Sequence, residues 1–408
     1  MNWLYKIVRL VDIAKINYGY TAKASFEGDG PKFLRITDIQ NGAVNWHSVP
    51  VCTIDQADLN RHRLHEDDIV FARTGATTGK SYRLKNPPEA VAASYLIRLR
   101  IHDKEILPSF VSLFFQTTEY WDSIAVGTSG SAQGGFNASK LSELRIPKPP
   151  LPEQKRIVAI LDEAFEGIDA AVANTEKNLA NARELFESHL NGVFTQKGDG
   201  WVEKKLEENI RFIDYRGKTP KKIEKGLRLI TAKNVRMGYL QQEPEEFVSP
   251  DSYDNWMTRG IPEEGDVLFT TEAPLGFVCQ LDTSEKVVFA QRIITMQPDR
   301  SLINPAFLKY ALRSSLLQSR IHEKATGATA QGIKASLLKK VTFPCAGTEE
   351  QGAVVESLDA MSLETQRLES IYQQKLEALT ELKQSILQKA FAGELTALPE
   401  KDLDEAVA

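Results

Sequence analysis

The sequence is poor in cysteine and histidine and has no long apolar run, and each shortage excludes a class of protein. Among its 408 residues are 3 cysteines and 6 histidines. The cysteines lie far apart and form no C-x-x-C pair, which argues against a disulfide framework and against a cysteine-rich zinc site. No apolar run approaches the roughly 18 residues that span a bilayer. We therefore expect a protein that is not inserted in a membrane and lies in a reducing cytoplasm.

The overall composition is that of an ordinary globular protein. Glycine and proline, with 25 and 18 residues, are near average usage, which excludes collagen-like and low-complexity sequence. Hydrophobic residues make up 42% and charged residues 26% of the chain. At roughly 100 to 200 residues per domain, the length allows two to four domains.

The net charge of −5 conceals an alternation along the chain. Residues 1–150 carry 18 basic and 15 acidic side chains (+3), and residues 200–347 carry 22 and 18 (+4). Residues 151–199 carry 5 and 9 (−4), and residues 348–408 carry 5 and 13 (−8). Two mildly basic blocks thus alternate with two acidic segments. This pattern is compatible with nucleic-acid binding by the basic blocks and equally with ordinary solvated surfaces.

The same division appears as an internal repeat with an offset of about 197 residues. The strand-like segment HEDDIVFA, with Asp68 and Phe71, matches PEEGDVLFT, with Asp266 and Phe269. Further matches pair Trp3 with Trp201, Pro108 with Pro305, Gln133 with Gln331, Gln154 with Gln351, and Asp162 with Asp359. The period is far too long for a solenoid, so each half is expected to be a domain followed by an appended element.

Each appended element is predicted to be a long helix with one apolar seam. In the first, residues with 3-4 spacing are Val158, Leu161, Phe165, Ile168, Val172, Thr175, Leu179, Ala182, Phe186, His189 and Val193. The second begins with a capping-box pattern at Thr348 and Gln351 and runs to Gly393. Its seam residues are Leu358, Met361, Thr365, Leu368, Tyr372, Leu379, Leu382 and Ile386. Helices of about 40 residues are too long to fold back on their own block, so we expect them to pair as an antiparallel coiled coil.

The two blocks are predicted to be small α+β domains. The stretches FLRITDI, DIVFAR and SYLIRLRI in the first block, and LRLITAKNV, DVLFTT and VVFAQRIITMQP in the second, are typical of strands. PSFVSLFFQT and PAFLKYALRS are typical of short helices. The predicted fold is therefore α+β: two tandem pseudo-symmetric domains (1–150 and 199–347) separated by two long antiparallel paired helices (151–198 and 348–395). A short acidic tail (396–408) follows.

Three segments imitate enzyme motifs, and each lacks an essential part. Residues 75–81 (GATTGKS) resemble a phosphate-binding loop, but Thr74 stands at the first glycine position and no helix is expected to follow. Residues 26–30 (FEGDG) resemble the cofactor turn of methyltransferases but do not follow an apolar strand. Residues 86–89 (NPPE) resemble the element that holds a target adenine, but Glu89 replaces the aromatic ring. We expect no catalytic residue in this chain.

No metal site or nucleophile is indicated either. His62 and His65 are three residues apart, but no third ligand is fixed by the pattern, and a solvated turn is the simpler interpretation. There is no G-x-S-x-G element. We expect no metal and no cofactor bound to this chain.

Polar, glycine-containing loops of the two blocks are the candidate DNA contacts, since hydroxyl, amide and cationic groups on adaptable backbone suit phosphates and base edges. The candidates in the first block are Arg73, Thr74, Thr77, Lys80, Ser131, Gln133 and Lys140. Those in the second are Arg216, Lys218, Lys221, Lys222, Thr271, Thr329, Gln331 and Lys334. The alternative interpretation is that these loops are solubilising turns.

Six segments of the sequence form a recognisable set. They are the helix starts PPLPEQKRIVAILD and TEEQGAVVESLD, the segments YRGKTPKK and GDVLFTTEAPLG, and the helix ends HLNGVF and ILQKAFAGEL. Over essentially its whole length the sequence resembles the specificity subunits of type I restriction-modification systems. The resemblance implies that each domain reads one half of a bipartite site on double-stranded DNA and that the paired helices fix the gap. CAGTEEQGAV departs mildly from its counterpart KPPLPEQKRI, which leaves the start of the second helix less certain.

The resemblance also implies the partners of the chain. Two modification subunits would dock on the helical regions and methylate adenine with S-adenosylmethionine, and two restriction subunits would add ATP-dependent translocation and cleavage. S-adenosylmethionine, ATP and magnesium would then be held by the partner subunits. Apolar helix residues expected to lie outside the seam, and so to contact the modification subunits, are Ile157, Leu185, Ile371 and Leu387. Two alternatives remain: a coiled-coil scaffold that does not read DNA, and a phosphate-loop nucleotidase.

Overall fold

The computed structural model divides the chain into two compact units. Unit 1 comprises Met1–Thr175 and Gln374–Ala408, and unit 2 comprises Glu176–Gln373. Each unit therefore holds one globular block and a part of each long helix. The residues that the structure describes are 5–40, 42–128, 135–215, 219–290, 292–327 and 331–395.

The two long helices predicted from the sequence are present. Helix α6 spans Leu151–Gln196, with 46 residues, and α11 spans Thr348–Phe391, with 44 residues. Gly393, with a φ of +81°, follows the end of α11, where a left-handed residue commonly closes a helix. In the described part of the chain, no helix is long and apolar enough to cross a membrane.

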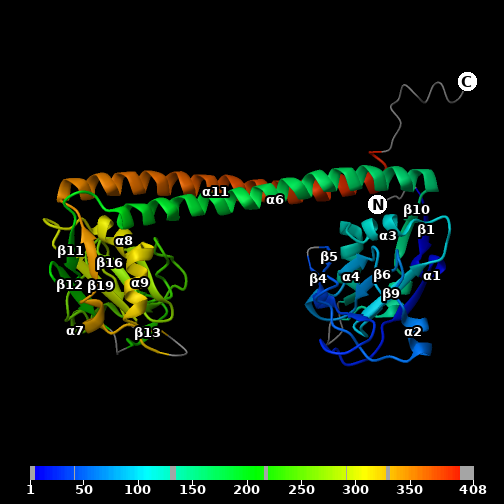
Figure 1. Cartoon of the computed structure of the whole chain (residues 1–408), viewed down its shortest axis with the longest axis horizontal. Coiled ribbons are helices and arrows are strands. Elements are labelled where there is room, and N and C mark those ends of the chain that lie inside the picture. The colour runs from blue at the N-terminus through cyan, green and yellow to red at the C-terminus, as the bar shows by residue number, and fades with distance from the viewer. Residues whose placement is uncertain are drawn as a thin grey trace, which may run out of the picture. The chain divides into compact units, whose positions relative to one another are not determined.

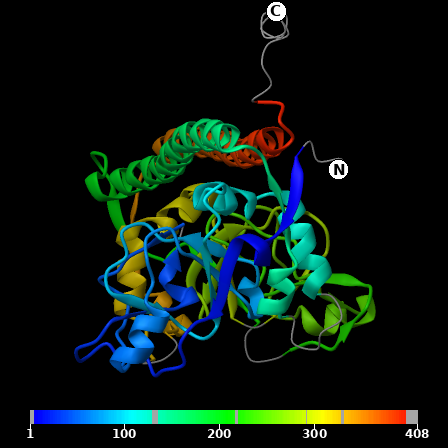
Figure 2. The ribbon, with the colours of Figure 1, turned by 90° about the vertical axis from the view of Figure 1, so that its right-hand side faces the viewer.

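The helices pair in an antiparallel manner within each unit. In unit 1, Ile157 and Leu161 near the start of α6 share a core with Leu387 near the end of α11. In unit 2, Leu190 near the end of α6 shares a core with Leu358 near the start of α11. Figures 1 and 2 both show the last turns of α11 alongside the first turns of α6. The expected antiparallel pairing is therefore confirmed.

The details of the seam differ from the prediction. Ile157 and Leu387, which were expected to be exposed, are each only 1% exposed, because the globular block covers the helix ends beyond the two-helix seam. Leu382, which was expected in the seam, is 46% exposed. The neighbouring Lys383 takes its place: its ammonium lies 4.6 Å from the centre of the Phe165 ring and 2.7 Å from the carboxylate of Asp169.

The globular block of unit 1 is built on a four-stranded antiparallel sheet of order β2-β9-β6-β7. Its strands are β2 (Ala14–Tyr18), β9 (Leu96–Ile101), β6 (Ile69–Ala72) and β7 (Ser81–Arg83). Successive side chains of a strand point to opposite faces. Accordingly Ile69 and Phe71 join the core beside the helices, whereas Val70 joins a second core. The sheet is thus covered on both faces.

Short elements complete unit 1. They are β1 (Lys6–Arg9), α1 (Leu10–Ile13), β3 (Lys32–Leu34), η1 (Ile36–Asp38), β4 (Ile39–Gln40), β5 (Ala43–Val44), α2 (Gln56–His62), η2 (Gly75–Thr77), β8 (Ala90–Ala92), α3 (Pro108–Phe114), α4 (Thr118–Thr128), α5 (Ala138–Ser142) and β10 (Arg145–Lys148). Strands β1 and β10 pair antiparallel and β3 and β8 pair parallel, so the block has mixed pairing. Helix α3 lies between the strands and the long helices (Figure 1).

Unit 2 repeats this topology. Its four-stranded sheet has the order β12-β19-β16-β17, with β12 (Ile210–Asp214), β19 (Ile293–Pro298), β16 (Val267–Thr271) and β17 (Leu275–Gln280). The other elements are β11 (Val202–Lys205), β13 (Lys222–Ile223), β14 (Leu227–Ile230), β15 (Phe247–Val248), η3 (Pro250–Ser252), α7 (Tyr253–Trp256), β18 (Val288–Phe289), α8 (Pro305–Arg313), α9 (Ser315–Glu323), α10 (Ala335–Leu338) and β20 (Thr342–Cys345). The matching orders confirm the α+β fold and the pseudo-symmetry expected from the repeat.

Two predicted strands are shorter than their sequence patterns suggest. The strand predicted in SYLIRLRI begins at Leu96, which leaves Tyr95 outside the sheet. The long stretch VVFAQRIITMQP is split into β18 and β19, because Arg292 has a φ of +66°, which a strand does not allow. An exposed side chain thus shortens the predicted strand of unit 1 at its start and divides the predicted strand of unit 2.

A buried glutamine joins each long helix to its block. The side-chain oxygen of Gln154 accepts the Leu107 N–H (2.8 Å), and its amide donates to the carbonyls of Glu105 and Pro149 (both 2.8 Å). Gln351 repeats the arrangement: it accepts the N–H of Asn304 (2.7 Å) and donates to the carbonyls of Leu302 and Ala346. Both side chains are fully buried. Each glutamine therefore satisfies the backbone of the turn before α3 or α8 and fixes the start of the long helix.

We expect Gln351→Leu to lower the free energy of unfolding by at least about 2 kcal/mol. The backbone N–H of Asn304 and the carbonyls of Leu302 and Ala346 would lose their hydrogen-bond partner, at about 1 to 3 kcal/mol for each buried group. Gln384→Leu, at an exposed position of the same helix, is the matched control and should change the unfolding free energy by less than about 0.5 kcal/mol. Urea unfolding followed by circular dichroism measures both. Equal effects of the two variants would contradict the role of Gln351.

We also expect Phe391→Ala to destabilise the protein by about 3 to 5 kcal/mol, because it opens a cavity in an aromatic cluster. The Phe391 ring centre lies 5.0 Å from that of Phe110 and 5.7 Å from that of Phe114. Leu382→Ala in the same helix should cost less than about 1 kcal/mol because Leu382 is exposed. Urea unfolding followed by circular dichroism measures both variants. A loss of unfolding free energy above about 1 kcal/mol for Leu382→Ala would show that Leu382 packs in the seam between the helices.

Candidate nucleic-acid interface

The first loop cluster, defined as residues 72–80, 93–95 and 135–140, gathers loops at one end of the sheet of unit 1. The N–H of Arg73, directly after β6, donates to the carbonyl of Tyr95 (3.2 Å). The carbonyl of Arg73 accepts the N–H of Phe136 (2.9 Å). Two of the loops selected from the sequence, 72–80 and 128–140, are thereby joined, and the turn before β9 is added to them.

The side chain of Arg73 is held in place within this cluster. Its Nε donates to the carbonyl of Ser94 (3.0 Å), and its guanidinium carbon lies 5.0 Å from the centre of the Tyr18 ring. The Tyr18 hydroxyl in turn accepts the N–H of Ala138 (3.1 Å). Tyr18 and Tyr95 are both exposed. An arginine fixed against an exposed ring can contact a phosphate or a base edge with little loss of side-chain entropy.

The loop of residues 75–81 is a hairpin connection and not a phosphate-binding loop. It forms the single 3-10 turn η2 and leads into β7, so no helix follows it. Gly79 has a φ of +94°, and a Cβ there would lie 2.7 Å from the Trp121 ring. The buried Tyr120 hydroxyl donates to the Gly79 carbonyl, and burial raises the pKa of Tyr120. Tyr120 and Trp121 of α4 thus hold the loop in place.

The remaining candidates of unit 1 have different surroundings. Thr77 donates to the carbonyl of Thr74 (3.4 Å), both threonines are half-buried, and Lys80 is exposed. Lys140 donates its ammonium to the carbonyl of Gly127 (2.6 Å), so it also supports the loop. The candidates Ser131, Gln133, Arg216, Lys218 and Thr329 lie outside the described residues.

The second loop cluster, defined as residues 271–273, 292 and 331–334, repeats the backbone arrangement in unit 2. The N–H of Thr271, the last residue of β16, donates to the carbonyl of Arg292 (2.8 Å), and the Thr271 carbonyl accepts the N–H of Ile333 (2.9 Å). Thr271 was expected to contact DNA, but its side chain is buried and its hydroxyl donates to the Arg292 carbonyl (3.3 Å). That prediction is corrected: Thr271 positions Arg292.

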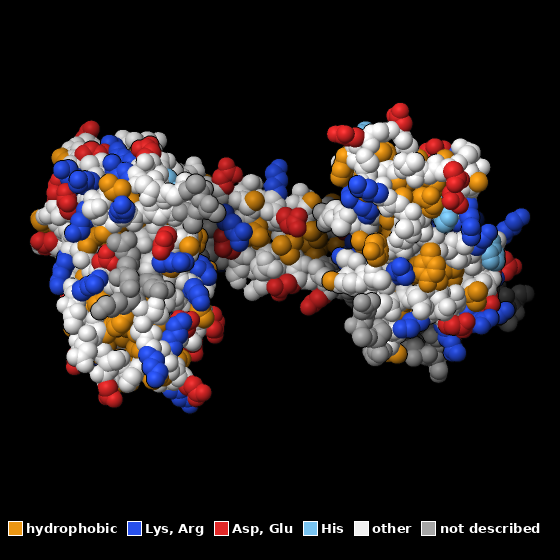
Figure 3. Space-filling model, turned by 90° about the horizontal axis from the view of Figure 1, so that it is seen from below, with side chains coloured by type: hydrophobic (Ala, Val, Ile, Leu, Met, Phe, Trp, Pro, Cys, Tyr) orange, Lys and Arg blue, Asp and Glu red, His pale blue; other side chains and the backbone are white. Residues whose placement is uncertain are grey.

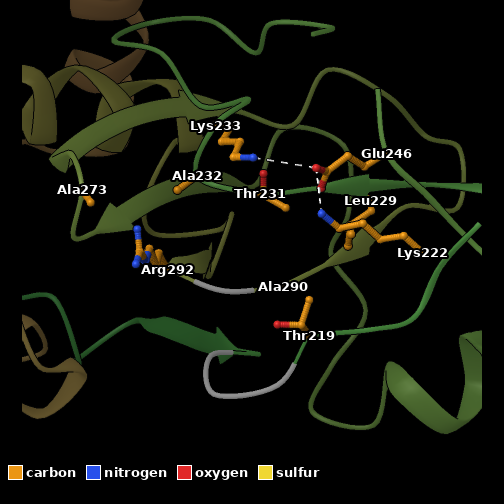
Figure 4. A pocket seen from close by; sticks show the side chains of 10 residues that line it. All are labelled: Thr219, Lys222, Leu229, Thr231, Ala232, Lys233, Glu246, Ala273, Ala290 and Arg292. Carbon is orange, nitrogen blue, oxygen red and sulfur yellow. Dashed lines mark ion pairs between the residues drawn. The ribbon is translucent and has the colours of Figure 1, made fainter. Parts of the chain in front are cut away.

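A pocket of about 190 Å³ adjoins this cluster and is lined by three cationic side chains, Lys222, Lys233 and Arg292. The Glu246 carboxylate lies 2.8 Å from the Lys222 ammonium and 3.9 Å from that of Lys233. Figure 4 shows the two lysines approaching Glu246 from different directions. Glu272 also lies 3.1 Å from Nε of Arg292, so three cations and two carboxylates leave one positive charge at the pocket. Such a charge suits a phosphate or an electronegative base edge.

Other predicted residues of unit 2 lie around the pocket or near it. Lys222 belongs to β13, which lies at the end of unit 2 farthest from the long helices (Figure 1). Lys221 and Lys334 are exposed. The Gln331 side-chain oxygen lies 3.0 Å from Nδ1 of His322. An isolated antiparallel β-bridge between Glu272 and Gly332 joins the segments around Thr271 and Gln331.

Among the described residues, the cations on the face of each unit turned away from the long helices stand singly and not in one broad patch. Figure 3 shows Lys and Arg side chains scattered there among uncharged and acidic ones. Positive charge available to a polyanion is therefore local to the loops, as in the Lys222, Lys233 and Arg292 group. This agrees with the small net charges of the two blocks.

The structure adds four residues that sequence reasoning did not select: Tyr18, Tyr95, Lys233 and Arg292. Tyr95 and Arg292 were assigned to the interior of predicted strands. A signal was nevertheless present, because the two residues are 197 positions apart, as the repeat requires, and differ in chemistry. Tyr18 and Lys233 had no comparable signal, because their place in the clusters depends on distant contacts.

The histidine pair considered in the sequence lies in a structural setting. The His62 ring lies 5.4 Å from the Tyr20 ring, and burial lowers its pKa. No group of three or more His, Cys, Asp or Glu side chains arranged to hold a metal ion occurs within the residues that the structure describes.

Comparison with known proteins shows which proteins the chain is similar to. Residues 3–179 match the family model described as "Type I restriction modification DNA specificity domain". The chain is 24% identical over 389 residues to the type I restriction enzyme EcoKI specificity subunit of Escherichia coli strain K12, covering 89% of this chain and 82% of that protein. It is also 24% identical over 428 residues to the EcoBI specificity subunit of Escherichia coli, covering 97% and 87%.

A solved structure shows the same fold. It is described as "Structural basis underlying complex assembly and conformational transition of the type I R-M system", and one of its chains matches with a TM-score of 0.77 and 18% identity, covering 96% of this chain and 98% of that chain. The duplicated sheets and the paired helices agree with that fold. Residues 3–179 match the type I DNA specificity domain, and most of the chain is similar in sequence to specificity subunits of type I restriction enzymes.

Proposed function

We propose that this chain supplies the DNA sequence specificity of a type I restriction-modification complex, and that each globular block reads one half of a bipartite site on double-stranded DNA in the cytoplasm. The observation that carries the proposal is the pair of loop clusters. Their backbones make the same hydrogen bonds around Arg73 and Thr271, but their exposed side chains differ. A repeated framework with different exposed groups suits two readers of two different half-sites.

The chemistry of modification and restriction is assigned to partner subunits in this proposal. The loop of residues 75–81 lacks the following helix that would bind nucleotide phosphates. The segment of residues 26–30, which resembles a methyltransferase turn, presents an exposed Phe26 and is separated from β2, the preceding strand of the main sheet, by residues 19–25. S-adenosylmethionine, ATP and magnesium would therefore be bound by two modification and two restriction subunits, and this chain would orient them on DNA.

The paired helices offer the surface for the modification subunits. Leu185 on α6 and Ile371 on α11, both selected from the sequence, are exposed, and the structure adds Leu363 and Leu382 on α11. Exposed leucine and isoleucine side chains on regular helices suit burial against a protein partner. A scaffold that binds only protein would use the same helices, but it would not require two loop clusters with a common backbone and different cations and rings.

The half-sites should respond independently to substitution. Arg73→Ala should change recognition in one half of the methylated motif, and the double variant Lys222→Ala with Lys233→Ala should act on the other half. A side chain that reads a base should cost about 1 to 3 kcal/mol at one position. A lysine that contacts phosphate should weaken binding to all sequences and flatten the salt dependence. The measurement is adenine-methylation mapping of cells that carry each variant with its modification partner.

Lys104→Ala, an exposed lysine of unit 1 in the turn before α3, is the control and should leave the motif unchanged. Simultaneous changes in both halves after a substitution in one block would show that the blocks form one composite reader. A wild-type complex that methylates no bipartite motif would contradict the proposed function itself.

Assembly should depend on the exposed apolar side chains of the helices. Leu185→Glu combined with Ile371→Glu should reduce co-purification of the modification subunit by at least about tenfold, because burying an unpaired carboxylate opposes the contact. Val126→Glu, at an even more exposed apolar position on α4, should leave assembly intact. Size-exclusion chromatography of the co-expressed subunits provides the readout. Intact assembly of the double variant would place the interface elsewhere.

A further inference from the structure

Tyr95 and Arg292 occupy the same position in the two repeated frameworks. They are 197 residues apart and immediately precede β9 and β19, the equivalent strands of the two sheets. The carbonyl of Tyr95 accepts the N–H of Arg73 (3.2 Å), and the carbonyl of Arg292 accepts the N–H of Thr271 (2.8 Å). The residues that follow them, Leu96 and Ile293, are both buried. Sequence spacing, topology and hydrogen bonds therefore agree on the equivalence.

The two side chains at this position are exposed and chemically different. Tyr95 is 63% exposed, and the Arg292 side chain is 50% exposed. Buried apolar residues lie close by in both units: Ala93 and Ala290 come two residues before this position, and Leu96 and Ile293 come directly after it. A difference at an outward position beside buried apolar residues is not required by packing, and it is a place where two readers of different sequences would diverge.

The Arg292 backbone is held in a conformation that a residue with a Cβ seldom adopts. Its φ is +66°, and both the N–H and the hydroxyl of Thr271 donate to its carbonyl, at 2.8 and 3.3 Å. Non-glycine residues in this region cost free energy and persist where the surroundings fix them, often at functional sites. Its Nε lies 3.1 Å from the half-exposed carboxylate of Glu272, a surface ion pair that DNA contacts can replace.

We propose that Tyr95 and Arg292 are the equivalent specificity-determining residues of the two blocks, an inference that rests on the proposed function. Arg292 donates two hydrogen bonds to the O6 and N7 of one guanine in the major groove of the half-site read by unit 2. The lysines of the adjoining pocket, Lys222 and Lys233, bind the flanking phosphates. Tyr95 cannot form this fork, and its ring contacts an apolar base edge such as a thymine methyl group in the other half-site.

The test uses the complete chain co-expressed with its modification partner, and the readout is the map of methylated adenines. Arg292→Gly removes the side chain and suits a positive φ, so the backbone of the cluster is preserved. Arg292→Lys keeps the positive charge but loses the planar fork. Both variants should relax one guanine position of one half-site, with roughly 5- to 150-fold loss of discrimination there, and leave the gap and the other half unchanged.

Tyr95→Ala should relax one position in the opposite half of the motif. Arg211→Ala is the matched control, because Arg211 is an exposed arginine on β12 paired with Gln297, near the end of β19 away from Arg292. It should leave the motif unchanged. If Arg292→Gly does not assemble with its partner, the Arg292→Lys map provides the decision, since that variant retains the long cationic side chain.

The outcomes separate the inference from the proposed function. A bipartite wild-type motif whose every position survives Arg292→Lys and Arg292→Gly would overturn the inference and leave the proposed function standing. So would relaxation at a position other than guanine, or relaxation in both halves at once. A wild-type complex without any bipartite motif would overturn the proposed function, and the inference with it.

Discussion

The buried glutamine at the start of each long helix is the constraint on which the arrangement within each unit depends. Gln154 and Gln351 each close the hydrogen bonds of a turn that leads into a short helix of the block, and they do so from the first turns of α6 and α11. An apolar residue in either place would leave buried donors and acceptors unpaired. The same contact therefore fixes where the helix begins and how it leaves its block.

A second repeated pair strengthens this junction. The Tyr5 hydroxyl donates to Glu153 (3.2 Å), and the Trp201 indole donates to Glu350 (2.7 Å), in both cases next to the glutamine. Aromatic clusters then bury the helices against the blocks, with Phe391 on Phe110 in unit 1 and Phe194 on Phe307 in unit 2. Polar contacts thus define the register of each helix, and apolar burial supplies most of the stabilisation.

The proposed function requires one fold to hold two readers, and this separation of buried framework from exposed loops suits that requirement. The framework residues are buried and match between the halves, so their packing does not depend on the half-site. Loop side chains such as Tyr95 and Arg292 are exposed next to strand ends, where substitution costs little stability. The loop residues proposed to carry specificity can therefore differ between the halves while the sheet, the glutamine contacts and the paired helices stay the same.

The sequence by itself determined the repeat, the α+β class, the two long helices and most of the loops in the clusters, because periodicity and a 197-residue offset are local or one-dimensional signals. It did not determine which helix residues are exposed: Ile157 and Leu387 are covered by the block, and Lys383 replaces Leu382 at the seam. It also assigned Tyr95 and Arg292 to strands and Thr271 to the surface. Only the tertiary structure decided these cases, because exposure and backbone conformation there depend on contacts between residues that are distant in the sequence.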